Sequence, residues 1–188
     1  MNIILSQLTI TRKTIFLLLI SAFTVYAATK VVTQLQQGDM LKISEFTELY
    51  PSPLDKSGNV QVDPILSKIT RQGTGPKALI GEMMTVHYTG CLPAKMDSTK
   101  NMVIRSKIEN SIKVGAQFDS SVKRGQPFQF KLGAKQVIPG WDFILAQMKV
   151  GEKRIVILPA NQAYGARATG SIPANSTLIF EIELIKAS

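Results

Sequence analysis

The chain has 188 residues, of which 45% are hydrophobic and 19% are charged, a balance that suits a globular domain with a real core and excludes a wholly disordered chain. Lysine and arginine exceed aspartate and glutamate by 22 to 13, which gives a net charge of +9. The basic residues are scattered, without runs of four and without interleaved aromatic residues, so the charge indicates solubility and nucleic-acid binding is not expected.

The first 27 residues have the pattern of a secretory signal peptide. Arg12 and Lys13 precede an apolar stretch, 15–25, that contains no acidic residue, and small residues follow at Ala27 and Ala28. Because this run is shorter than the roughly 20 apolar residues that span a membrane, we expect cleavage near Ala27 or Ala28 rather than a permanent anchor. The pattern predicts a periplasmic or secreted protein without a stable membrane span, anchored in the inner membrane only if the segment stays uncleaved.

Residues 28–64 predict an N-terminal arm and a linker. The apolar residues Ile43, Phe46, Leu49 and Tyr50 have the spacing of one or two helical turns. Two prolines and the turn-forming run 55–58 follow, which indicates the linker. Two roles stay open for the arm, namely packing on the surface of the main domain or dimerisation.

Residues 65–188 predict the main domain. Strand patterns cover 83–88, 128–132, 155–158 and 178–185, and in the last of these Glu181 and Glu183 alternate with apolar residues and are expected to face water. One amphipathic helix is predicted over 140–148, with Pro139 before it and Gly151 after it. Several strands with one short helix indicate an α+β fold in which a curved antiparallel sheet wraps around the helix.

Residues 91–117 interrupt this strand pattern. Ile104, Ile108 and Ile112 recur every four residues, Asp97 or Ser98 could cap the start of a helix, and the glycine at position 115 could stop it. We therefore expect a helical insertion in this connection.

Most forms of enzyme chemistry are missing from the sequence. His87 is the only histidine, so neither a Ser-His-Asp set nor a histidine-based metal site is expected. Cys91 is the only cysteine and cannot form an internal disulfide, and no phosphate-binding or dinucleotide-binding glycine motif is present. An enzyme with this composition would act through shape, desolvation and hydrogen bonding.

Six short motifs recur in the order and spacing of one family. They are His87-Tyr88-Thr89-Gly90, Phe118-Asp119-Ser120-Ser121, Gln136-Val137-Ile138-Pro139-Gly140-Trp141, Gln147-Met148-Lys149-Val150-Gly151, Ala163-Tyr164-Gly165 and Ile172-Pro173. Together they cover about residues 65–186 and resemble the FKBP-type peptidyl-prolyl cis/trans isomerases, the macrolide-binding immunophilins. The resemblance implies an FKBP-like fold and a rotamase activity that assists protein folding. It also marks about twenty residues of 91–117 as an insertion, because the family usually has a tight hairpin connection there.

The resemblance also implies a concave apolar pocket. Its catalytic residues would be Trp141 as the floor, with Tyr88, Phe118, Asp119 and Tyr164 around it. Its substrate-binding residues would be Phe128, Val137, Ile138, Phe180 and Arg124. The Tyr164 hydroxyl and the Ile138 N–H would donate hydrogen bonds to substrate carbonyls, and Arg124 would pair with the Asp119 carboxylate.

The partners that the resemblance implies are proline-containing polypeptides, unfolded exported proteins and macrolide inhibitors, with no cofactor and no metal. The alternative is a holdase-type chaperone or binding module with a weak or vestigial pocket. Gln136 and Pro139 depart from the usual family residues, and the loop 166–171 is slightly short, but we expect Gln136 to act mainly through its backbone carbonyl and Pro139 to fit a helix start.

Overall fold

The computed structural model describes residues 34–49, 64–94 and 110–188 of the chain. The predicted signal segment, most of the linker and the centre of the insertion lie outside these residues. Within the described part, no helix is long and apolar enough to cross a membrane.

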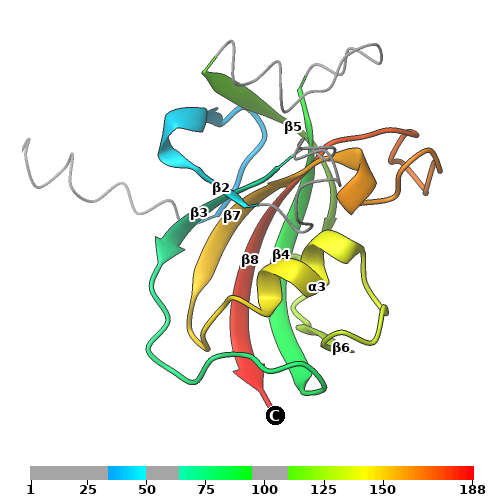
Figure 1. The fold of residues 1–188 in the computed structure, drawn as a ribbon. Helices are drawn as coiled ribbons and strands as arrows, with labels where there is room; N and C mark the ends of the chain where they lie inside the picture. Colours follow the sequence, from blue (N-terminus) through cyan, green and yellow to red (C-terminus); the bar gives the residue numbers. More distant parts are fainter. Residues whose placement is uncertain (1–33, 50–63, 95–109) are drawn as a thin grey trace, which may run out of the picture. The chain divides into compact units, whose positions relative to one another are not determined.

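The described residues form one curved antiparallel sheet with a short helix on one face (Figure 1). The strand order is β1-β5-β4-β8-β7-β3-β2, and β6 pairs with the start of β4. The elements are β1 (Met40–Lys42), η1 (Ile43–Glu45), β2 (Thr47–Leu49), β3 (Ile65–Arg71), β4 (Met83–Pro93), β5 (Ser111–Ser120), β6 (Phe128–Lys131), α3 (Pro139–Leu145), β7 (Lys153–Leu158), η2 (Ala160–Gln162) and β8 (Leu178–Ala187). The predicted α+β fold, a curved sheet wrapped around one helix, is confirmed.

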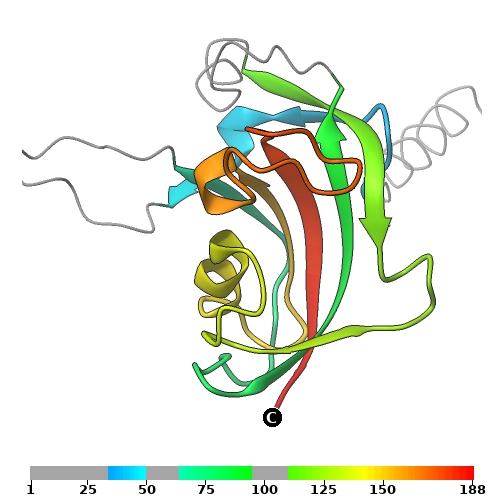
Figure 2. The same cartoon turned by 90° about the vertical axis from the view of Figure 1, so that its right-hand side faces the viewer.

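Helix α3 packs against the concave face of the sheet and builds the main core there (Figures 1 and 2). Pro139 occupies its first turn, where a missing N–H costs nothing, and Trp141, Ile144 and Leu145 are buried. The helix ends three residues earlier than the sequence predicted. The N–H groups of Gln147 and Met148 bond to carbonyls three residues back, at 3.0 Å each, so the last turn tightens instead of continuing.

The arm contributes strands to both edges of the sheet. Met40–Lys42 pair with β5, and Thr47–Leu49 pair with β3. Between them the 3-10 turn η1 places Ile43 against a second core on the other face of the sheet. Of the one or two helical turns predicted from 43–50, only the three-residue 3-10 turn Ile43–Glu45 is present, because 47–49 pair with a sheet edge and this outweighs a spacing that covers only two turns. Position 50 lies outside the described residues.

This second core changes the environment of β8. Glu181 was expected to face water, but it is only 5% exposed, whereas Glu183 is half-buried. Alternation along β8 correctly separates the two faces, but it does not reveal that the arm and its apolar neighbours cover the convex one. The prediction for Glu181 is therefore wrong.

The hairpin of β4 and β5 extends into the predicted insertion. β4 continues to Pro93 and β5 begins at Ser111, so Ile112 lies buried in a strand and not on a helix. Gly115 is also within β5, where a Cβ atom would come within 2.7 Å of the Ala94 backbone. The close approach of two backbone segments of the hairpin, and not the end of a helix, accounts for this glycine. Ile104 and Ile108 lie outside the described residues.

Candidate active site

Aromatic rings gather where α3 faces the centre of the sheet. The ring of Tyr88 on β4 lies 5.0 Å from the Trp141 ring on α3, in an edge-to-face arrangement. The ring of Phe180 on β8 lies 5.3 Å from Trp141 and 6.3 Å from Tyr88. These geometries are the favourable ones for aromatic pairs, so the three rings fix one another's orientation.

Two further rings widen this aromatic cluster. Phe128 on β6 lies 6.1 Å from both Tyr88 and Trp141, and Phe118 on β5 lies 5.6 Å from Phe180. Trp141 is 4% exposed, whereas Tyr88, Phe118 and Phe128 are half-buried. The cluster thus contains the buried rings of Trp141 and Phe180 with partly open rings beside them.

A charged group lies at the edge of the aromatic cluster. The Tyr88 hydroxyl donates to one oxygen of Asp119, and the Arg124 guanidinium binds the other. Arg124 also donates to the Tyr88 oxygen at 3.1 Å, and its guanidinium carbon lies 5.7 Å from the centre of the Tyr88 ring. The expected pairing of Arg124 with Asp119 is therefore present.

This contact set controls the ionisation of both acidic groups. Partial burial alone would raise the pKa of Asp119, but hydrogen bonds from Tyr88 and Arg124 outweigh it and hold this pKa below its ordinary value. Burial, followed by the hydrogen bond to Asp119, raises the pKa of Tyr88. At neutral pH the edge of the cluster therefore carries a fixed carboxylate and a neutral phenol.

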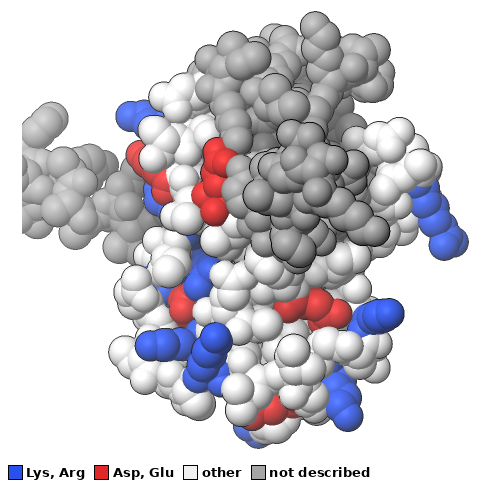
Figure 3. Space-filling model, in the orientation of Figure 1, with Lys and Arg blue, Asp and Glu red and all other residues white. Residues whose placement is uncertain are grey.

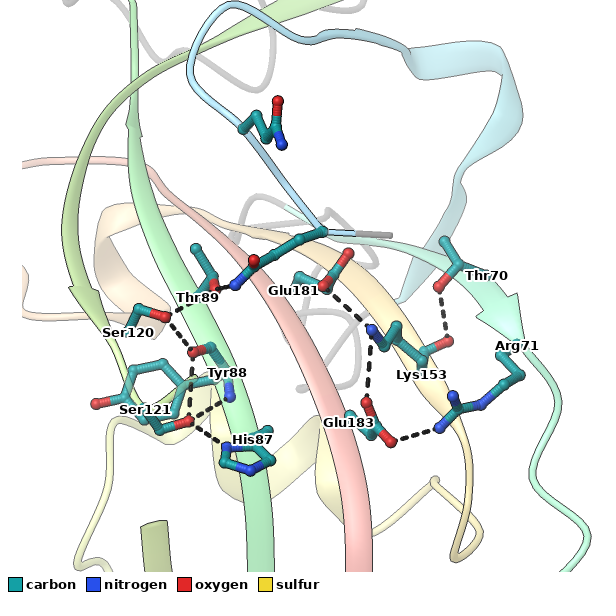
Figure 4. A network of polar contacts seen from close by, with 12 residues as sticks. Thr70, Arg71, His87, Tyr88, Thr89, Ser120, Ser121, Lys153, Glu181 and Glu183 are labelled. Carbon is teal, nitrogen blue, oxygen red and sulfur yellow. Dashed lines mark hydrogen bonds and ion pairs between the residues drawn. The ribbon is translucent and has the colours of Figure 1, made fainter. Parts of the chain in front are cut away.

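A polar support behind the cluster fixes the backbone of Tyr88 (Figure 4). The buried hydroxyl of Ser121 accepts the Tyr88 N–H at 2.8 Å and lies 3.0 Å from Nδ1 of His87. The Ser121 N–H donates to the Tyr88 carbonyl at 3.1 Å. His87 is thus held in a hydrogen-bonded structural position, and Ser121 joins the strands that carry Tyr88 and Asp119.

Gly90 belongs to the site although the sequence predicted no role for it beyond its place in a motif. A Cβ atom at this position would come within 2.6 Å of the Phe118 ring and 2.8 Å of the Phe180 ring. The absence of a side chain lets both rings pack over β4. The signal that could have found it is a glycine inside a strand pattern, which often marks a close approach.

Three further predicted site residues are Val137, Ile138 and Tyr164. Val137 and Ile138 pack against the main core at the start of α3. Among the described residues the Ile138 N–H has no hydrogen-bond acceptor, so it is available as a donor. Tyr164 follows η2, is 40% exposed, and takes no part in the ring contacts given for the described residues. The side chain of Gln136 accepts the Lys131 N–H at 2.8 Å, so this residue acts through more than the backbone carbonyl that was expected.

No three His, Cys, Asp or Glu side chains come together as a possible metal site within residues 34–49, 64–94 and 110–188.

Known proteins resemble this chain across the domain that carries the site. The family model of the FKBP-type peptidyl-prolyl cis-trans isomerases matches residues 75–185. This chain belongs to the FKBP-type isomerase family. The enzyme class follows with it, a peptidyl-prolyl cis-trans isomerase.

Relatives of this FKBP-type isomerase come from several eukaryotes. FK506-binding protein 1 of Saccharomyces cerevisiae is 42% identical over 132 residues, which cover 70% of this chain and 95% of the yeast protein. FK506-binding protein 1 of Dictyostelium discoideum is 44% identical over 118 residues, covering 62% of this chain and 92% of that protein. The crystal structure of AtFKBP13 superposes with a TM-score of 0.53 at 31% identity and covers 72% of this chain and 97% of that one.

Proposed function

We propose that this FKBP-type isomerase catalyses rotation about X–Pro bonds of exported polypeptides at the aromatic cluster beside Asp119. The observation that carries this proposal is the combination of a buried Trp141, half-open rings around it and an ionised carboxylate fixed at their edge. Such a site has apolar surface for a prolyl ring and polar groups for the amide next to it.

The aromatic cluster favours the twisted amide over the planar one. Resonance makes the planar amide polar and resists rotation by about 18–20 kcal/mol. In the twisted state this resonance is lost, so the carbonyl oxygen carries less negative charge. Surroundings made of Trp141, Tyr88 and Phe180 solvate the polar planar form poorly and penalise the twisted form less. The barrier therefore falls without proton transfer.

The polar groups at the edge of the aromatic cluster hold the substrate chain while the bond rotates. We assign the free Ile138 N–H to a substrate carbonyl and the Tyr164 hydroxyl to a second one, which would hold the chain on one side of the rotating bond. The negative charge of Asp119, placed beside the reacting carbonyl, would raise the energy of the planar amide, in which the oxygen is more negative. Arg124 and Tyr88 act as positioning residues for that carboxylate.

Proline-peptide turnover tests the catalytic part of the proposal. In a chromogenic proline-tetrapeptide assay, Asp119→Ala should reduce kcat/KM at least about tenfold, since it removes the charge and the anchor of Tyr88. Tyr164→Phe, which removes only a hydroxyl, should reduce it less. FK506, named for what the relatives bind, should inhibit the wild-type chain. Turnover that neither substitution changes would place the site elsewhere, and absent turnover with retained binding of unfolded protein would favour a holdase.

Export is the second part of the proposal. It is supported by the basic residues Arg12 and Lys13 ahead of the apolar stretch 15–25. Folding of exported proteins can be limited by proline isomerisation, which takes tens of seconds or more without catalysis. An isomerase in their compartment therefore has substrates to act on. The mass of the chain recovered from its own cells should correspond to a start near Ala28 or Thr29. A recovered chain that begins at Met1 in the cytoplasm would contradict export.

A further inference from the structure

The turn between β3 and β4 carries two exposed aliphatic side chains. Leu79 is 59% exposed and Ile80 is 78% exposed, the highest values among the large hydrophobic residues that the structure describes. The turn itself is well held, because the Leu79 N–H donates to the Glu82 carboxylate at 2.9 Å and the Glu82 N–H donates to the Leu79 carbonyl at 3.2 Å. Gly81 has a φ of +96°, which suits glycine and fixes the direction of the turn.

A second loop, 131–135, lies beside this turn. The Gly81 N–H donates to the Leu132 carbonyl at 3.0 Å, and the Leu132 N–H donates to the Glu82 carbonyl at 2.9 Å. The side chain of Ile80 lies over Gly133 so closely that a Cβ atom there would be 2.8 Å from it. Met83, also exposed, is in register with Lys131 of β6. The two loops thus present one apolar surface at this end of the sheet.

Lysines surround that surface. Lys77 forms an antiparallel bridge with Lys149 on one side, and Lys131 and Lys135 lie exposed on the other. None of these four forms an ion pair within the described part of the chain. We call this assembly, Leu79, Ile80 and Met83 with these four lysines, the lysine tip. Figure 3 shows basic side chains on both sides of the lower end of the domain, separated by uncharged surface and an acidic area.

The acids at the lysine tip are bound within the fold. The Glu82 carboxylate accepts the Leu79 N–H, and the Asp142 carboxylate accepts the Gly133 N–H at 2.9 Å. Both carboxylates keep their negative charge but are held against the loop backbone, and the four exposed lysines outnumber these two acids. A second copy of the same basic surface would be repelled, so self-association through the lysine tip is disfavoured.

We propose that the lysine tip docks this protein on an anionic membrane surface. Leu79 and Ile80 would enter the boundary between headgroups and acyl chains, and the four lysines would lie at the level of the lipid phosphates. The loops that follow β7, 160–177, lie at the opposite end of the sheet from this turn (Figures 1 and 2). Docking would therefore leave the Tyr164 side of the aromatic cluster open to polypeptide substrates.

A fluorescent label at a single position of the full chain tests the proposal, because it reports which surface of the domain meets the vesicle even if the N-terminal apolar segment also binds. Ile80→Cys supplies a thiol at the lysine tip, and Val122→Cys supplies one at an exposed position in the turn after β5. The native Cys91 is 1% exposed and burial raises its pKa to about 11, so the wild-type chain with the same dye serves as the unlabelled blank. Vesicles of phosphatidylcholine with phosphatidylglycerol are compared with vesicles of phosphatidylcholine alone.

With anionic vesicles only, the emission of the label at position 80 should shift to the blue, and the label at position 122 should not shift. Raising the salt concentration to about 0.5 M should reverse the shift at position 80, because salt screens the attraction between lysines and lipid. Lys131→Gln and Lys135→Gln should each weaken vesicle binding about fivefold, as one lysine near an anionic surface contributes. Equal shifts at both positions, a shift with neutral vesicles, or no shift would overturn the proposal. A shift only with polyglutamate would overturn it too and indicate an acidic protein partner. Peptide turnover is independent of all these outcomes.

Discussion

Asp119 is ionised and held by three groups, the hydroxyl of Tyr88, the guanidinium of Arg124 and the N–H of Ser120 at 2.7 Å. Because these contacts lower its pKa in the folded state, the stabilisation that its charge contributes is present above the ordinary aspartate value of 3.8 and is lost only as the pH falls through the lower folded value. Asp119 and Arg124 are both well exposed, so this contribution to stability is small. Its larger effect is on the charge that the site presents to substrate.

Activity should therefore be insensitive to pH around neutrality and should decline only when the pH falls below the ordinary aspartate value of 3.8. Arg124→Gln removes a hydrogen bond and a positive charge from Asp119, so the acid limb of the kcat/KM profile should move to higher pH. The pH profile of both chains with one proline tetrapeptide measures this. An unchanged acid limb in the variant would mean that Asp119 does not carry the essential charge.

Gly90→Ala should damage the site from inside the sheet. The added methyl group meets the Phe118 and Phe180 rings at less than 3 Å, so at least one ring must move away from the cluster. We expect kcat/KM to fall about tenfold and the free energy of unfolding to fall by about 1–3 kcal/mol. Turnover measured well below the melting temperature separates the two effects, and wild-type turnover in a folded variant would contradict this account of Gly90.

Tyr88, Phe118, Asp119 and Trp141 could be predicted from the sequence because short motifs carry them in fixed order, whereas Arg124, Phe128 and Phe180 were assigned from the family resemblance around those motifs. Gly90 and Ser121 lie within the same motifs, but their roles depend on atoms from other strands and could not be derived from spacing. The burial of Glu181 could not be predicted for the same reason. Alternation along β8 predicts which residues share a face, yet the cover on that face comes from residues 34–46, far away in the sequence.

At the scale of elements, the arm joins the two edges of the sheet through a turn of three residues. β1 lies against β5 and β2 lies against β3, at opposite ends of the strand order. Each of these strands has only three residues, which is too short for a period-two pattern to identify. β8 and the helix α3 could be predicted because their patterns extend over whole elements, whereas the ten-residue β5 was missed because its isoleucine continues a four-residue spacing that suggested a helix.

Ile43→Ala should destabilise the domain without affecting the chemistry. Ile43 is buried in the core on the convex face, so its truncation should lower the free energy of unfolding by about 2–4 kcal/mol. Met40→Ala is the matched control in the same arm, because Met40 is exposed and should change stability by less than about 0.5 kcal/mol. Urea unfolding and peptide turnover of both variants measure this. Equal stability of the two variants would mean that the arm is not packed as described.

At the scale of the whole molecule, one sheet separates two cores, and each contains a residue type that occurs once in the chain. Trp141, the only tryptophan, lies in the core on the concave face, and Cys91, the only cysteine, lies in the core beneath the arm. The indole fluorescence therefore reports on one core, and the thiol reactivity reports on the other.

The two reporters should separate in increasing urea. Because the arm is held by two three-residue strands, we expect it to open before the sheet does, so Cys91 should react with a thiol reagent at urea concentrations below the midpoint seen by Trp141 fluorescence. Ile43→Ala should widen this gap. Coincident transitions would show that the arm and the sheet unfold as one cooperative unit.

The register of the arm also has a consequence for the newly made chain. Lys42 is among the first described residues to be synthesised, yet its partner in β5 is Ser111, so Lys42 cannot pair until β3, β4 and the start of β5 have been made. Pairing of β1 with β5 closes a long loop, which is favourable only when the contacts that reward it exist. A chain cut short before β5 would leave Cys91 without Ile112 and Val114, the β5 residues of the same core. The uncovered apolar residues and thiol would mark it for a protease or a chaperone.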